Sequence, residues 1–170
     1  MKGNLKLISG KRIESPLSQK TRPTTSKVRE ALINILGTSL KDTSWLDLCS
    51  GSGVTACEAL QRGVKRILAI EKQRETAKTC KRNLIDVSST LDYAFHIQVI
   101  CTEMISFLKS GPENKKIAFT NDSPNLEPKF DFVFLDPPYD SNLYELSQEI
   151  LLSKKWIKKS STLICECSSK

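Results

Sequence analysis

The chain has 170 residues, of which 39% are hydrophobic and 26% are charged. This length suffices for one domain with a sizeable core, and the composition excludes a disordered or fibrous protein. The sequence contains no apolar run of membrane-spanning length and begins with no signal-peptide pattern, so we expect a cytoplasmic protein. The formal net charge of +7 indicates an acidic partner such as nucleic acid.

Residues 1–37 predict a β-hairpin followed by a helix. LKLISGKRIESP is typical of two short strands joined by a tight turn. In the following stretch, QKTRPTTSKVREALINILG, Thr24 or Thr25 can cap a helix that Gly37 can end. The apolar face of this helix would carry Val28, Leu32, Ile35 and Leu36.

From residue 45 onward, predicted strands and helices alternate. The predicted strands are 45–49, 66–71, 96–101, 130–136 and 162–167. The predicted helices between them are 54–63, 73–86, 103–111 and 142–153. This alternation predicts an α/β fold, with a mostly parallel sheet and helices on both faces. Residues 112–129, rich in Pro, Asn, Asp and Lys, are interpreted as a mobile loop within a single domain of residues 1–170.

Cysteine and histidine form no metal-binding pattern. The six cysteines include no C-x-x-C pair, and the one histidine, His96, lies between two apolar residues. We therefore predict free thiols, a structural histidine and no bound metal.

The first candidate site is a glycine turn, LDLCSGSGVTACEAL, between the strand at 45–49 and its helix. Gly51, Gly53 and Ala56 form a G-x-G-x-x-A pattern, which lets the chain turn sharply and lets a ligand approach the backbone closely. Glu71 ends the next strand, where a carboxylate can accept hydrogen bonds from both hydroxyls of a ribose. The pattern predicts a nucleoside-cofactor site and leaves open whether the nucleoside belongs to a nicotinamide cofactor or to S-adenosylmethionine.

Two further acids accompany this turn. Asp47 is better suited to a cationic ammonium group than to a pyrophosphate. Glu103 follows the third predicted strand and could meet the amino group of an adenine. Neither residue decides between the two cofactors.

The second candidate site is FVFLDPPYD, residues 132–140. If the acceptor is the exocyclic amine of a base, the Asp136 carboxylate and the Pro137 carbonyl can accept its two N–H bonds and turn its lone pair toward a methyl donor. Pro137 and Pro138 fix φ and remove competing N–H donors, and Tyr139 offers a face for stacking an extruded base, worth about 1–3 kcal/mol. Catalysis would then rest mainly on positioning and electrostatics.

Asp-Pro-Pro-Tyr can also simply end a strand. The catalytic interpretation is favoured because ligands of open α/β sheets bind at the carboxyl ends of the strands, where the strand order reverses. If the fourth strand neighbours the first, Asp136 and Gly51 face the same crevice.

Three stretches, RPTTSKVREAL, LDLCSGSGVTACEALQRG and FVFLDPPY, give the chain a resemblance to the bacterial 16S ribosomal RNA guanine-N2 methyltransferases, of the type acting on guanine 966. The resemblance covers nearly the whole chain. It implies a Rossmann-like methyltransferase fold, S-adenosylmethionine as cofactor, and a monomer whose partner is 16S RNA within a small-subunit particle. It also implies a last hairpin, continuing the sheet about where this sequence stops.

The resemblance also assigns roles to residues. It implies that S-adenosylmethionine is held by Asp47, Gly51, Gly53 and Glu71, with Glu103 and Met104 near the adenine. The target guanine would be held by Asp136, Pro137, Pro138 and Tyr139. Four residues would lie over the active site, where they would touch RNA or become ordered when the cofactor binds: Arg22, Thr24, Thr25 and Arg29. Glu103 stands where the family often has a shorter Asp or Asn.

Three alternatives remain open at this point. An adenine-N6 DNA or RNA methyltransferase shares Asp-Pro-Pro-Tyr, although no segment is large enough for a separate DNA-reading domain. A nicotinamide-dependent oxidoreductase shares the glycine turn and leaves Asp-Pro-Pro-Tyr unexplained. A non-catalytic RNA-binding protein on the same scaffold would not need both motifs intact.

Overall fold

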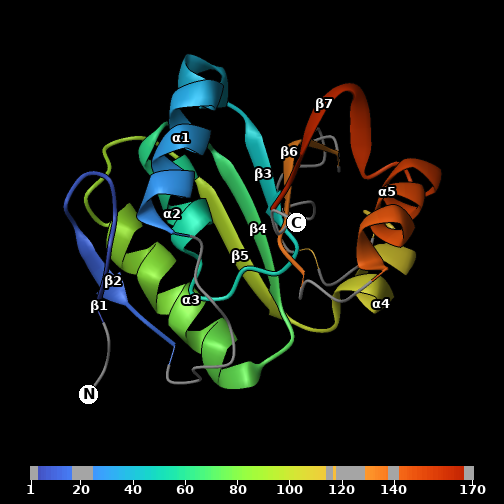
Figure 1. Cartoon of the computed structure of the whole chain (residues 1–170), viewed down its shortest axis with the longest axis horizontal. Coiled ribbons are helices and arrows are strands. Elements are labelled where there is room, and N and C mark those ends of the chain that lie inside the picture. The colour runs from blue at the N-terminus through green and yellow to red at the C-terminus, as the bar shows by residue number, and fades with distance from the viewer. Residues whose placement is uncertain (1–3, 17–24, 114–116, 118–128, 138–141, 167–170) are drawn as a thin grey trace.

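A five-stranded parallel sheet forms the centre of the protein, with the strand order β5-β4-β3-β6-β7 (Figure 1). The computed structural model describes residues 4–16, 25–113, 117, 129–137 and 142–166. The strands are β3 (Ser44–Asp47), β4 (Arg66–Glu71), β5 (His96–Cys101), β6 (Phe130–Leu135) and β7 (Ile157–Cys165). The strand order reverses at β3, which lies between β4 and β6, and open sheets of this kind bind ligands at the carboxyl ends of the strands beside such a point.

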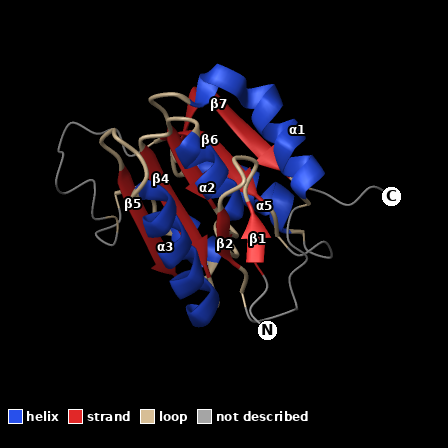
Figure 2. Ribbon diagram, turned by 90° about the vertical axis from the view of Figure 1, so that its left-hand side faces the viewer, coloured by secondary structure: helices blue, strands red, loops and turns tan. Residues whose placement is uncertain are grey.

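Helices cover both faces of this sheet, as the alternating pattern predicts (Figures 1 and 2). One face carries α1 (Ser26–Leu36), α2 (Val54–Gln61) and α3 (Arg74–Ser88). The other face carries α4 (Met104–Lys109) and α5 (Leu143–Ser153). A short 3-10 helix, η1 (Gly37–Leu40), links α1 to β3. The predicted α/β fold is confirmed.

A tryptophan anchors the core on each face of the sheet. Trp45 of β3 is fully buried, with its ring centroid 6.1 Å from that of Phe132 and 6.0 Å from that of Phe134. On the other face Trp156 is fully buried, and its indole N–H donates to the Leu108 carbonyl of α4 at 2.8 Å. Both faces of the central strands are therefore buried in apolar side chains, as parallel sheets require.

The predicted N-terminal hairpin is present and packs beside α3. Its strands β1 (Asn4–Lys6) and β2 (Arg12–Glu14) are antiparallel, with Leu5 opposite Ile13. Gly10 takes the positive φ of 89° that the turn between them requires. Ile13 is buried in the core with α1, α2 and α3, so the hairpin is an integral part of this face.

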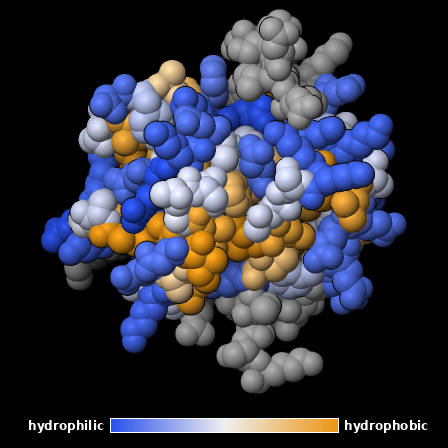
Figure 3. All heavy atoms as spheres, turned by 90° about the horizontal axis from the view of Figure 1, so that it is seen from above, coloured by the Kyte–Doolittle hydropathy of each residue, from blue (hydrophilic) through white to orange (hydrophobic). Residues whose placement is uncertain are grey.

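Helix α1 begins and ends where the sequence predicts, but it buries only part of its predicted apolar face. The Thr25 hydroxyl accepts from the Val28 N–H at 3.3 Å, and Gly37 ends the helix with a φ of 49°. Val28 and Ile35, predicted to face the core, are 45% and 81% exposed, whereas Arg29 and Ile33 are buried. Leu32 and Leu36 pack against the core as predicted. The prediction was wrong for Val28 and Ile35, because Arg29, ion-paired with Glu58 inside the protein, occupies part of the inner face. Figure 3 shows a band of apolar side chains across the surface seen from above.

Strand β7 begins at Ile157, five residues before the predicted start. Ile157 pairs with Phe130, and the next pair joins Thr162 to Phe132, so β7 carries extra residues at a bulge. The Ser161 hydroxyl bridges this bulge: it donates to the Phe130 carbonyl at 2.7 Å and accepts from the Lys158 N–H at 2.7 Å. At the bulge, the Ser161 side chain makes hydrogen bonds in place of the regular backbone pairing. The alternation of apolar residues in the sequence does not predict such a bulge.

Two further predictions concern membrane-spanning helices and the loop at 112–129. No helix within the described residues is long and apolar enough to cross a membrane. The predicted loop at 112–129 lies mostly outside the described residues, although Ile117 is buried in the core beneath α4 and α5.

Candidate functional site

The glycine turn joins β3 to α2, and its backbone requires glycine at two positions. Gly51 and Gly53 have φ values of 53° and 75°, in the region that side chains rarely adopt. At Gly53, a Cβ atom would also lie 2.7 Å from the sulfur of Cys80 on α3. The turn is therefore tight, and at Gly53 its close packing against α3 leaves no room for a side chain.

Glu71, the last residue of β4, holds this turn in place. Its carboxylate accepts from the Gly51 N–H at 3.0 Å and from the Gln73 N–H at 2.8 Å. Each carboxylate oxygen accepts more than one hydrogen bond, so these two bonds leave capacity for a ligand hydroxyl. The predicted ribose contact remains a prediction.

Strand register places three carboxylates on one face of the sheet, at its carboxyl edge. Asp47 pairs with Ala69 of β4 and with Phe134 of β6. Glu71 and Asp136 each lie two residues further along those strands, and side chains alternate with a period of two. The fourth predicted strand (β6) neighbours the first (β3), as expected, so Asp136 and the glycine turn lie at the same edge of the sheet.

The electrostatics at this edge of the sheet favour a cationic ligand. Asp47 is 1% exposed, and within the described residues its Oδ1 has no hydrogen-bond partner. Burial, together with Asp136 and Glu71, raises the pKa of Asp47 to about 8. Burial and the charge of Glu166 raise the pKa of Asp136 to about 7. Carboxylates buried together without a positive partner carry a desolvation cost that a bound cation would relieve.

These residues fit S-adenosylmethionine better than a dinucleotide. Its ammonium and sulfonium groups are positive, and the unpartnered Oδ1 of Asp47 offers them an acceptor. A pyrophosphate would instead bring negative charge beside Asp47 and Glu71. The alternative of a nicotinamide-dependent oxidoreductase is therefore disfavoured by charge.

The two residues expected near the adenine lie at the start of α4. Glu103 caps this helix, since its carboxylate accepts from the Ile105 N–H at 2.9 Å and the Ser106 N–H at 2.7 Å. Burial acts to raise the pKa of Glu103, but these hydrogen bonds together lower it. Met104 is 5% exposed, with its sulfur 3.8 Å from that of Cys49 after β3. Helix capping accounts for Glu103, and the adenine contacts of both residues remain predictions.

The remaining predicted residues have different placements. Pro138, Tyr139, Arg22 and Thr24 lie outside the described residues. Thr25 caps α1. Arg29 is 3% exposed: its guanidinium donates to the Lys6 carbonyl at 2.7 Å and lies 3.6 Å from the Glu58 carboxylate. Its position is therefore that of a residue joining α1 to the hairpin and to α2, and its predicted role toward RNA is untested.

Asn83 of α3 is a structural link that sequence reasoning missed. Its side chain accepts from the Glu14 N–H at 2.8 Å and donates to the Glu14 carbonyl and the Ser52 carbonyl, both at 2.9 Å. Ser52 lies between the two glycines of the turn, so Asn83 ties the N-terminal hairpin to the glycine turn. No sequence signal marks it, whereas the acid Glu58 within the apolar helix VTACEAL could have been noticed.

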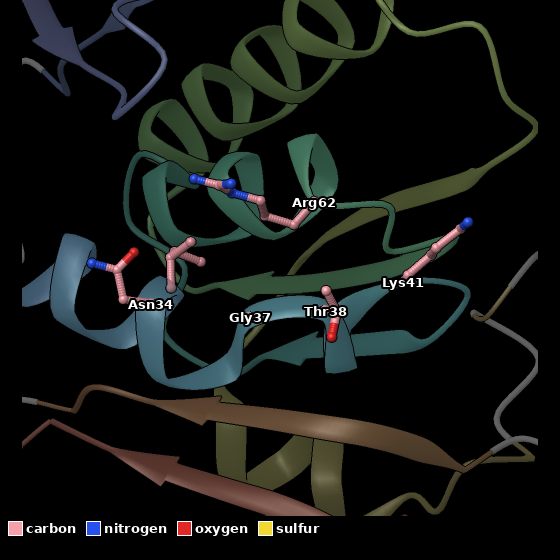
Figure 4. A pocket seen from close by; sticks show the side chains of 6 residues that line it. Asn34, Gly37, Thr38, Lys41 and Arg62 are labelled. Carbon is pink, nitrogen blue, oxygen red and sulfur yellow. The ribbon is translucent and has the colours of Figure 1, made fainter.

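A hollow of about 330 Å³ lies at the opposite edge of the sheet, before β3 and β4 begin (Figure 4). It is lined by Ile33, Asn34, Gly37, Thr38, Lys41 and Arg62. Lys41 and Arg62 point in different directions in Figure 4, so their charges do not converge on one ligand. The described residues also contain no group of three or more His, Cys, Asp or Glu side chains that could hold a metal ion.

Comparison with known proteins identifies the family. The family model described as conserved hypothetical protein 95 matches residues 5–170. The ribosomal RNA small subunit methyltransferase D of Buchnera aphidicola subsp. Acyrthosiphon pisum is 31% identical over 168 residues, covering 99% of this chain and 76% of that protein. The chain belongs to this methyltransferase D family. The Haemophilus influenzae member is 31% identical, over 97% of this chain and 79% of its own.

Solved structures agree with membership of the methyltransferase D family. The provisionally assigned methyltransferase yhhF of Escherichia coli has a TM-score of 0.75 and 25% identity, covering 99% of this chain and 83% of that one. The resemblance drawn from the three sequence stretches is thus confirmed. The fold is the α/β Rossmann-like methyltransferase fold.

Proposed function

We propose that this chain methylates small-subunit ribosomal RNA with S-adenosylmethionine as donor, and that the acceptor is the N2 amine of a guanine. The observation that carries this proposal is the position of Asp136 and Pro137, at the end of β6, beside the glycine turn that follows β3. Relatives named ribosomal RNA small subunit methyltransferase D support the RNA substrate.

On the cofactor side, the backbone at Gly51 and Gly53 would line the nucleoside, Glu71 would accept from the ribose, and Asp47 would face the ammonium group. S-adenosylmethionine, when bound, supplies a methyl group made electrophilic by its sulfonium. In their ionised forms, Asp47, Glu71 and Asp136 favour the charged donor over the neutral product that remains after transfer. Electrostatics thus support both binding of the donor and release of the product.

On the acceptor side, the Asp136 carboxylate and the Pro137 carbonyl would each accept one N–H of the amine. Both bonds hold the nitrogen lone pair toward the methyl group, which is the positioning that a poor nucleophile needs. Transfer makes the nitrogen cationic, and one proton must leave. Asp136, with a pKa of about 7, is suited to stabilise this charge and to accept that proton near neutral pH.

The hairpin offers a surface for the RNA phosphates. Lys6 and Arg12 are directly opposite each other on β1 and β2, on the exposed side of the hairpin, and no carboxylate pairs with either among the described residues. Like charges in a directly opposite pair repel, and a bound phosphate would relieve this repulsion. The net charge of +7 supports the same partner.

The test offers radiolabelled S-adenosylmethionine and the purified protein to three substrates: small ribosomal subunits from a strain lacking this modification, bare 16S RNA, and unmethylated DNA. Label is expected in N2-methylguanosine from RNA, and comparison of subunits with bare RNA identifies the natural substrate. Label in N6-methyladenine would overturn the guanine assignment. Binding of the cofactor without label in any substrate would overturn the activity.

A further inference from the structure

Glu166 is a fourth carboxylate at the same edge of the sheet. Leu135 of β6 pairs with Cys165 of β7, so Asp136 and Glu166 are the next residues along two neighbouring parallel strands. Residues in register on such strands project to the same face. The ladder also continues to this point, because the Glu166 N–H donates to the Leu135 carbonyl at 3.1 Å. Glu166 therefore stands beside Asp136, on the side away from the cofactor loop.

The backbone of Glu166 is held on both sides. Its N–H is bound by β6, as described, and its carbonyl accepts from the Tyr144 hydroxyl of α5 at 2.5 Å. Glu166 itself is half-buried. These two bonds fix the Glu166 backbone and so the direction in which its side chain leaves the strand, which supports recognition of a planar base.

We propose that Glu166 reads the target base by accepting the N1–H of the guanine, while Asp136 accepts from the neighbouring N2 amine. The proposal rests on the proposed function, since it takes guanine N2 as the acceptor. N1–H and the N2 amine are adjacent donors on one edge of guanine, and Asp136 and Glu166 are adjacent acceptors at the ends of β6 and β7. The match is between two neighbouring donors and two neighbouring carboxylates.

This arrangement would explain how the protein separates guanine from adenine, although adenine-N6 enzymes use the same Asp-Pro-Pro-Tyr sequence. Adenine has an acceptor at N1, and a carboxylate facing it would be repelled and left without a partner. Sites built to hydrogen-bond a substrate donor reject analogues that lack it by large factors, up to about 10⁴–10⁵. Extruded bases are commonly read along this edge.

The charges around Asp136 support the same placement. Among the described residues, Glu166 acts on it from the end of β7 and Asp47 lies across from it on β3, and the charge of Glu166 adds to burial in raising the pKa of Asp136. Replacing Glu166 with a neutral residue should therefore lower that pKa. A side chain distant from the acceptor would not have this effect.

The experiment compares two RNA substrates, one with guanine at the methylated position and one with 2-aminopurine there. 2-Aminopurine keeps the 2-amine but has an acceptor at N1. The wild type is expected to prefer guanine by at least about 100-fold in kcat/KM. Glu166→Gln should reduce this preference by at least about tenfold, because an amide can donate to N1 of 2-aminopurine. Glu166→Asp, which keeps the carboxylate, should retain the preference.

Glu149→Gln on the exposed side of α5 is the matched control and should change nothing. The rising limb of the pH–rate profile should move to lower pH in Glu166→Gln and stay in place in Glu149→Gln. Calorimetric binding of S-adenosylmethionine shows that each variant is folded. A Glu166→Gln variant with the wild-type preference would overturn the inference. So would a wild type that accepts both bases within about threefold, whatever the variants do. A wild type inactive on guanine would instead refute the proposed function.

Discussion

Asn83→Ala should destabilise the protein and weaken cofactor binding together. Asn83 is 2% exposed, and its three hydrogen bonds join α3 to β2 and to Ser52 in the glycine turn. Each bond contributes about 0.5–1.5 kcal/mol, so their loss should lower the free energy of unfolding by about 2–4 kcal/mol. In a chain of this size that corresponds to a fall in Tm of about 5–15 °C.

Urea unfolding of Asn83→Ala and of Asn34→Ala, an exposed asparagine on α1, measures this difference directly. Asn83→Ala should also bind S-adenosylmethionine less tightly at a temperature where both variants are fully folded, because the Ser52 carbonyl loses its donor. Asn83→Asp keeps the acceptor for Glu14 and loses both donors, so it should share the binding defect. A free energy of unfolding within about 0.5 kcal/mol of that of Asn34→Ala would refute the reasoning.

Three further predictions concern the carboxylates. Asp136→Ala should reduce methylation by at least about 100-fold while cofactor affinity, measured by calorimetry, stays within about threefold; an equal loss of affinity would move Asp136 to the cofactor site. Glu71→Ala should instead weaken cofactor binding, because the ribose and the Gly51 N–H both lose their acceptor. An unchanged cofactor affinity would contradict the assignment of Glu71 to the ribose. Burial raises the pKa of Asp47 from 3.8 to about 8. Between about pH 4 and pH 8, Asp47 therefore keeps its proton in the folded chain and loses it in the unfolded chain. Stability without cofactor should therefore fall as the pH rises from about 4 to 8, and chemical unfolding of Asp47→Asn should show a flatter dependence.

The arrangement of the site could be predicted from the sequence, because its acidic residues come at the ends of apolar stretches that are typical of buried strands. Strand, glycine turn, helix and strand in that order predict a parallel sheet, and the carboxyl ends of parallel strands meet at one edge. Glu71 and Asp136 were therefore expected together, and the order of β4, β3 and β6 places them so. Only the register shows that Glu166 belongs with them, since β7 pairs with β6 after a bulge that periodicity does not predict.

The polar links between elements could not be predicted in the same way. The apolar pattern of α1 suggested that Val28 and Ile35 face the core, but Arg29 lies there, paired with Glu58 of α2. A buried ion pair depends on two residues far apart in the chain, and neither residue alone indicates the other. The same holds for Asn83, whose partners lie on β2 and in the glycine turn.

The even spacing along β4 and β6 has a consequence for how this chain can change. Asp47 pairs with Ala69 and Phe134, and Glu71 and Asp136 each come two residues later. Deleting one residue from β6 would turn Asp136 toward α4 and α5 and bury a charge among their apolar side chains, whereas deleting two would keep its side of the sheet. Insertions or deletions inside these strands therefore keep the acids on the same face of the sheet only when they involve an even number of residues. The connections at the amino edge of the sheet are remote from the acids and carry no such restriction.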